Sequence, residues 1–263
     1  MRLFYIISFL NKSLRRGYVS ASGRNFLGKI CIAHRGGGSK RNKFYIDFFR
    51  RINMFGYLLK IKKIRSYTGF LGLMIYENGL SNYILLSDDV VLGDYLYFGT
   101  SLIVNKENSC LQLGSSVPLS YVSLFSLINN IESTAFAGGK LARAAGTSGI
   151  LISKFANSVT IKLKSGYNLT LSSFNICSLG IVSNATHRFS RIRKAGIMRS
   201  RGIRPTVRGV AMNPCDHPHG GGEGRKSPPA SHRSPWGWLT KGTPTLRKKH
   251  QILRRNLTKI KNN

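Results

Sequence analysis

The sequence predicts a mainly β protein: two small barrels, a basic N-terminal arm and a long irregular C-terminal extension. Two observations carry this prediction. Between residues 29 and 182, short runs rich in β-branched and aromatic residues alternate with Gly, Asn and Asp, as in short antiparallel strands. After Thr186 that pattern stops, and the chain stays basic. We therefore place the arm at 1–22, the first barrel at 23–115, the second at 116–195 and the extension at 196–263.

The first barrel is predicted from five runs that have the composition of strands. These runs are Lys29–His34, Lys43–Arg50, Tyr57–Arg65, Leu71–Glu77 and Tyr83–Leu86. Asn78-Gly79 lies between the last two runs, and an Asn-Gly pair is a strong signal for a tight hairpin. Because the stretch that follows is acidic, we expect this side of the barrel to face solvent.

The second barrel is predicted to be of the SH3-like kind. Its runs are Leu127–Ser133, Gly149–Lys154, Ser158–Leu163, Tyr167–Leu171 and Ile176–Val182, with a turn at Lys164–Tyr167. Between the barrels, residues 137–148 consist mostly of small residues with the cations Lys140 and Arg143. This composition predicts a tight passage of the backbone against another surface.

Two loops rich in glycine and basic residues are the candidate binding elements. The first, residues 35–43, is predicted to lie on the rim of the first barrel. The second, residues 201–226, shows neither a helical nor a strand period, and arginines flank its Gly220–Gly222 run. Glycine lets a ligand approach the backbone closely, and guanidinium groups suit phosphate oxygens and base edges. The alternative interpretation is a pair of flexible, solvated basic loops.

Charge is strong and unevenly distributed. The chain has 41 Lys and Arg against 9 Asp and Glu, a formal charge of +32. Residues 1–75 carry 16 basic and 1 acidic residue, residues 76–139 carry 1 and 6, residues 140–186 carry 5 and 0, and residues 187–263 carry 19 and 2. A free compact chain with this charge repels itself, so we expect a dense polyanion as partner. Basic ends around a near-neutral body favour nucleic acid, and RNA suits the loops best.

The sequence gives little support to an enzyme. The four cysteines form no CxxC pair, which indicates neither a zinc ribbon nor a disulfide framework. Cys215, His217 and His219 are closely spaced, but structural zinc needs four ligands and nucleophilic catalysis needs a group that orients the histidine. Gly220–Ser227 lacks the spacing of a phosphate-binding loop.

Residues 204–214 (RPTVRGVAMNP) and 216–225 (DHPHGGGEGR) carry a specific resemblance, which recurs at 23–25, 34–38, 45–48, 138–147, 234–237 and 240–242. In these residues the chain resembles the large-subunit ribosomal protein L2 family in its bacterial and organellar form, over nearly the whole chain from Gly23. The resemblance implies an OB-fold domain, an SH3-like barrel and a C-terminal extension into large-subunit rRNA. Cys215 departs from the family's usual Val, and residues 66–130 match weakly.

The resemblance implies a non-catalytic protein of the large subunit, associated with subunit joining and with tRNA binding near the peptidyl transferase centre. His217 matches the histidine that the family places nearest that centre, and we assign it a structural or tRNA-positioning role. Trp236 fits stacking on a base, with packing beside Pro235 as the alternative. The expected rRNA-binding residues are Arg35, Gly36, Gly37, Gly38, Lys40, Arg41, Lys140, Arg143, Arg204, Arg208, Asn213, His217, His219, Gly220, Gly221, Gly222, Arg225, Trp236 and Lys241.

The implied partners are large-subunit rRNA and neighbouring ribosomal proteins, with tRNA and small-subunit rRNA as further contacts. We expect no cofactor of the protein's own, and Mg²⁺ only as a companion of the bound rRNA. Drift towards Phe, Ile and Asn favours a mitochondrial ribosome in the matrix over a plastid or bacterial one. Two other classes stay open: a metal- or Cys-dependent hydrolase using residues 215–219, and a membrane-surface protein using the basic ends. No apolar run approaches the roughly 20 residues of a bilayer span.

Overall fold

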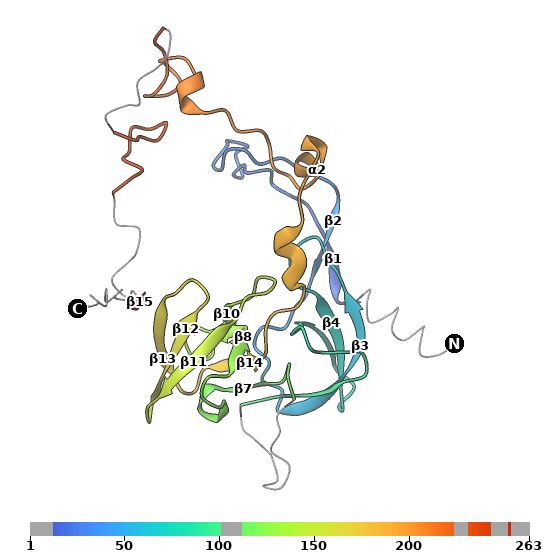
Figure 1. Ribbon diagram of the computed structural model, residues 1–263. Coiled ribbons are helices and arrows are strands. Elements are labelled where there is room, and N and C mark those ends of the chain that lie inside the picture. The colour runs from blue at the N-terminus through green and yellow to red at the C-terminus, as the bar shows by residue number, and fades with distance from the viewer. Residues whose placement is uncertain (1–12, 101–111, 224–230, 243–251, 254–263) are drawn as a thin grey trace, which may run out of the picture. The chain divides into compact units, whose positions relative to one another are not determined.

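The computed structural model describes residues 13–100, 112–223, 231–242 and 252–253 (Figure 1). The chain divides into two compact units. The first, which we call the β unit, contains the described residues of 13–18, 41–191 and 252–253. The second, the loop unit, contains the described residues of 19–40 and 192–242. Each unit thus joins segments that lie far apart in the sequence.

The β unit contains all the strands of the described residues. In chain order they are β1 (Arg15–Tyr18), β2 (Arg41–Phe44), β3 (Met54–Lys62), β4 (Leu71–Tyr76), β5 (Ser81–Leu85), β6 (Tyr95–Phe98), β7 (Ser116–Pro118), β8 (Leu127–Asn129), β9 (Ile131–Glu132), β10 (Gly139–Leu141), β11 (Gly149–Lys154), β12 (Ser158–Leu163), β13 (Asn168–Ser172), β14 (Ile176–Leu179) and β15 (Ile252–Leu253). The described part of this unit also contains two short 3₁₀ turns, Leu119–Tyr121 and Ala185–Phe189.

Most of these strands belong to one sheet. Its order is β15-β13-β12-β11-β8-β14-β7-β6-β3-β4-β5, and Figure 1 shows β11, β12 and β13 side by side. Neighbours are antiparallel except β6 and β7, which meet in a parallel pair at Phe98 and Ser116. That pair separates an N-terminal half (β3–β6) from a C-terminal half (β7, β8 and β11–β15). The predicted mainly β architecture is confirmed.

Several local predictions are confirmed in detail. β11 and β12 have the bounds that the sequence indicates. The Asn-Gly hairpin joins β4 to β5: Gly79 has φ +81°, and the Tyr76 N–H donates to the Leu80 carbonyl at 2.9 Å. Gly166, at φ +89°, closes the predicted turn between β12 and β13. Positive φ favours glycine at both positions.

The predicted strand Lys29–His34 is wrong. Only an isolated bridge between Ile30 and Arg24 forms in this stretch. Ile30 and Ile32 are 67% and 60% exposed, so no apolar surface is available to bury one face of a strand. His34, at φ +59°, bends the backbone away from an extended path. The predicted strand Lys43–Arg50 is likewise shorter than expected, because β2 ends at Phe44 and Arg50 has φ +53°.

Apolar side chains form three buried clusters in the β unit. One fills the C-terminal half and includes Val117, Ile128 and Ile161. The other two lie in the N-terminal half, around Phe98 and Tyr83 respectively. The core therefore draws both on the near-neutral middle of the sequence and on residues 44–74 of the basic N-terminal segment.

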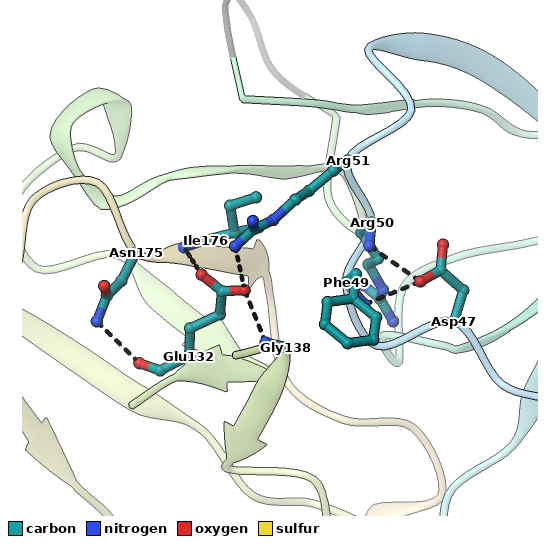
Figure 2. A network of polar contacts seen from close by, with 8 residues as sticks. All are labelled: Asp47, Phe49, Arg50, Arg51, Glu132, Gly138, Asn175 and Ile176. Carbon is teal, nitrogen blue, oxygen red and sulfur yellow. Dashed lines mark hydrogen bonds and ion pairs between the residues drawn. The ribbon is translucent and has the colours of Figure 1, made fainter. Parts of the chain in front are cut away.

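A buried polar network connects the two halves of the β unit (Figure 2). Arg50 is fully buried, and its guanidinium donates to the hydroxyls of Ser116 and Ser178 and to the Leu85 carbonyl. Burial lowers the pKa of Arg50 to about 10, so it stays charged at neutral pH. The Asp47 carboxylate accepts from the Arg50 N–H at 3.1 Å and from the Phe49 N–H at 2.8 Å, which shapes the turn that presents Arg50.

Glu132 is the second centre of this network. Its carboxylate is buried and pairs with Arg51 at 2.7 Å. It also accepts from the backbone N–H groups of Gly138 at 3.0 Å and Ile176 at 3.1 Å. Because Arg51 comes from the N-terminal half and the other groups come from the C-terminal half, one carboxylate joins both.

Candidate nucleic-acid interface

The loop unit is held together by backbone pairing between its two sequence segments. Gly36 N–H donates to Gly202 O at 2.8 Å, Arg204 N–H to His34 O at 3.1 Å, and Ser39 N–H to Ser200 O at 2.9 Å. The second segment reaches this position through a short helix, α2 (Ala195–Ser200). This pairing places the first glycine loop beside the start of the second.

The predicted location of the first loop therefore needs correction. Residues 35–40 belong to the loop unit and are not the rim of the first barrel. The reason is that residues 34–39 pair with residues 200–204. Residues 41–43, on β2, lie in the β unit, where Arg41 pairs with Tyr18. Arg35, Gly36, Gly37, Gly38 and Arg204 thus come together, whereas Arg41 does not join them.

The cations of this surface have no carboxylate partner among the described residues. Arg24, Arg35 and Arg204 are exposed, and the ion pair found in the described part of the chain is the one between Arg51 and Glu132. The unit has Asp216 and Glu223 as its only acids in sequence. Unneutralised guanidinium groups on ordered backbone suit phosphate oxygens.

The second loop packs on itself around His217. That side chain is only 8% exposed, and a Cβ placed on Gly209 would lie 2.5 Å from its ring. Within this loop, the packed part begins at a 3₁₀ turn, Gly209–Ala211. The Gly221 N–H donates to the Met212 carbonyl at 3.1 Å and closes this part. His217 Nδ1 accepts from the His219 N–H at 3.0 Å. His217 is therefore part of the packing of this loop.

His219 connects this loop to the segment 231–242. Its Nε2 accepts from the Arg233 N–H at 3.0 Å, and its ring lies 4.7 Å from that of His217, centroid to centroid. Beyond Arg233 the chain turns back, since Arg233 bridges Leu239. Trp236 and Trp238, on this turn, are 79% and 75% exposed. The described residues therefore cover little of either ring.

The remaining predicted residues are spread over both units. Arg208, Asn213, Gly222 and Lys241 are exposed in the loop unit, where Gly220 and Gly221 are half-buried. Lys140 and Arg143 are exposed in the β unit, and the Arg143 guanidinium lies 4.4 Å from the centre of the Phe48 ring. Arg225 lies outside the described residues.

One segment of the basic C-terminal part supplies none of the predicted binding residues. Residues 188–201 contain six Arg or Lys and no acid, and all six are exposed. The sequence signal for binding here is a run of basic residues without acids. Such runs are usually solvated surfaces, and this one contains only one glycine, Gly196, so it lacks the glycine-rich composition of the two candidate loops. Metal binding gains no support from the geometry, because no group of three or more His, Cys, Asp or Glu gathers within the described residues.

Two family models match the chain. The family model described as "Ribosomal Proteins L2, RNA binding N-terminal domain" matches residues 11–98. The model described as "Ribosomal Proteins L2, C-terminal domain" matches residues 112–237. Together the two models cover most of the chain.

Curated relatives match over most of their length. The large ribosomal subunit protein uL2m of Reclinomonas americana is 39% identical over 240 residues, 90% of this chain and 84% of the relative. The large ribosomal subunit protein uL2 of Orientia tsutsugamushi is 38% identical over 239 residues, with 90% and 85% covered. That of Rickettsia canadensis is 37% identical over 239 residues, with 90% and 85% covered. This chain belongs to the ribosomal protein L2 family.

Proposed function

We propose that this chain is a structural protein of the large ribosomal subunit that binds large-subunit rRNA. The observation that carries the proposal is the loop unit: exposed arginines without carboxylate partners among the described residues lie on a backbone that is fixed by long-range hydrogen bonds. Such a surface neutralises phosphates at fixed positions, and glycines let the RNA backbone approach. The chain's role in this proposal is binding and positioning, without catalysis, and Mg²⁺ accompanies the RNA.

The salt dependence of RNA binding tests this proposal. We expect the double variant Arg201→Ala, Arg208→Ala to bind large-subunit rRNA more weakly and to reduce the slope of log K against log salt by roughly two, because each phosphate contact contributes roughly one. The control is Lys60→Ala, because Lys60 is an exposed cation on β3, outside the loop unit. The strands that pair with β3 are flanked by acids, Glu77 after β4 and Asp94 before β6, so this surface is less suited to phosphate. Filter binding from low to physiological salt measures both slopes. An unchanged slope in the double variant would contradict the proposal.

The finer proposal concerns the particle. We place the chain in a mitochondrial ribosome, supported by the likeness to the mitochondrial uL2m, although bacterial relatives have similar identity. Contacts with neighbouring ribosomal proteins, tRNA and small-subunit rRNA belong to the same proposal. No helix in the described ranges is both long and apolar enough to cross a bilayer.

Sedimentation separates these possibilities. We expect the chain, in gradients of lysed purified mitochondria, to travel with the large subunit and to leave it after ribonuclease treatment. If instead it floats with anionic membranes after the same treatment, the basic ends serve a membrane surface. If it sediments with ribosomes from another compartment, the mitochondrial assignment is wrong and rRNA binding stands.

A further inference from the structure

A cavity in the loop unit has a lining that rRNA neutralisation alone does not explain. Its volume is about 310 Å³, at the lower end of the roughly 300–1,000 Å³ of small-ligand sites. Arg24, Arg35 and Arg204 line it together with Ile30, Ile32 and the backbone of Gly36. The cavity therefore combines three cations with two aliphatic side chains.

The walls are preformed by the fold. Gly23 accepts from the N–H groups of Cys31 at 2.9 Å and Ile32 at 3.0 Å, which closes the turn that carries Ile30 and Ile32. A Cβ on Gly23 would lie 2.3 Å from the Ile32 carbonyl oxygen, so a glycine is required there. On the other side, the bond from the Arg204 N–H to His34 O holds Arg204 against the loop. A ligand thus meets an ordered site.

The chemistry of the lining limits what the cavity can hold. Three guanidinium groups without carboxylate partners among the described residues call for an anion. A phosphate alone, however, gives no reason for Ile30 and Ile32 to be 67% and 60% exposed beside them. Exposed aliphatic side chains next to arginines suit a ligand that carries both a flat apolar face and a phosphate. The two must lie no further apart than the base and the phosphate of one nucleotide.

We propose that this cavity takes a single unstacked nucleotide of the bound RNA. Its base lies against Ile30 and Ile32, and its phosphate lies on the guanidinium groups of Arg24, Arg35 and Arg204. In an RNA duplex, stacking covers the faces of the bases, and a duplex is also too large to enter the cavity. The nucleotide therefore comes from a bulge, loop or single strand. The inference rests on the proposed rRNA binding and names one site within it.

Two matched variants of the full chain test the site. Ile32→Ser removes an apolar wall and leaves the charge unchanged, whereas Leu27→Ser makes the same kind of change at a 64% exposed residue outside the cavity. Both variants are bound to large-subunit rRNA from the cell that makes this chain, and the RNA is mapped by base-specific chemical probing. We expect Ile32→Ser to expose one nucleotide base that wild type and Leu27→Ser protect. We expect the Kd of Ile32→Ser to rise by about tenfold, since burying an aliphatic side chain is worth about a factor of ten in affinity.

The outcomes separate the two proposals. If wild type does not bind the rRNA, the proposed function fails. If all three chains bind and their base protections are identical, rRNA binding stands and the nucleotide site is wrong. If Arg204→Ala weakens binding while Ile32→Ser changes neither Kd nor any base, the cavity holds phosphate only, which also overturns the inference.

Discussion

Replacing Glu132 by alanine is expected to lower the free energy of unfolding of the β unit by about 3–5 kcal/mol, the usual cost of removing one partner of a buried ion pair. The carboxylate is fully buried and accepts three hydrogen bonds, from Arg51 and from the backbone N–H groups of Gly138 and Ile176. Without it, two buried backbone N–H groups and the partly buried guanidinium of Arg51 lose their partner, and each unsatisfied group adds to the penalty. No other substitution of a described acid is expected to cost as much.

Urea unfolding of the full chain, followed by far-ultraviolet circular dichroism, measures this loss. Asp89→Ala is the matched control, because Asp89 is exposed and the structure gives its carboxylate no bond to a described residue; a change within about 0.5 kcal/mol is expected. Glu132→Gln keeps the shape and one acceptor oxygen, so it should fall between the two. A loss below about 1 kcal/mol for Glu132→Ala would mean that water replaces the carboxylate and that the two halves do not depend on this link.

Glu132 also shows where sequence reasoning stops. Charge counting treats it as one of the six acids of residues 76–139 and indicates no buried partner, yet its side chain is among the least exposed of the β unit. Arg50 is the converse case, since a basic residue in a basic segment is expected at the surface and is instead fully buried. Both depend on partners that the fold brings in from other strands. Composition cannot reveal such partners, because their identity depends on tertiary structure.

Local signals fared better than long-range ones. The hairpin at Asn78-Gly79 and the bounds of β11 and β12 were predictable, because turn chemistry and strand composition act over a few residues. The position of the first glycine loop was not predictable, because Ser39 and Ser200 are 161 residues apart in the chain. Of the candidate site, sequence reasoning identified the residue types and the two loops. It could not identify their pairing or the cavity that Ile30 and Ile32 line.

The glycines of residues 220–222 have a role that the sequence did not indicate. Their lack of side chains was expected to admit RNA. In the structure, a Cβ on Gly220 would lie 2.2 Å from the Asn213 carbonyl oxygen, and one on Gly221 would lie 2.4 Å from Pro214 Cγ. The loop's own atoms therefore occupy that space. The loop needs Gly220 and Gly221 in order to close around His217. Any close approach of a ligand to their backbone is an additional role.

Gly220→Ala is accordingly expected to open this loop and to weaken rRNA binding by at least about tenfold, as expected from the loss of one or two phosphate contacts at physiological salt. The methyl group cannot be accommodated by a side-chain shift, because the atoms it meets are the backbone carbonyls of Asn213 and Met212. The Gly220 N–H also donates to the His217 carbonyl at 2.8 Å, so a shift of Gly220 exposes the buried imidazole.

Histidine ring signals in NMR spectra of the full chain, recorded beside filter binding to rRNA, follow the two effects separately. Gly196→Ala is the matched control: the same substitution in the loop unit, in α2, where a Cβ would meet no atom within 4 Å. There alanine should leave binding unchanged and favour the helix by up to about 1 kcal/mol. Shifted His217 signals with unchanged affinity would show that the closed loop is dispensable for RNA. Unchanged signals with lost affinity would instead place the added methyl group in the RNA contact itself, and the packing explanation for Gly220 would be wrong.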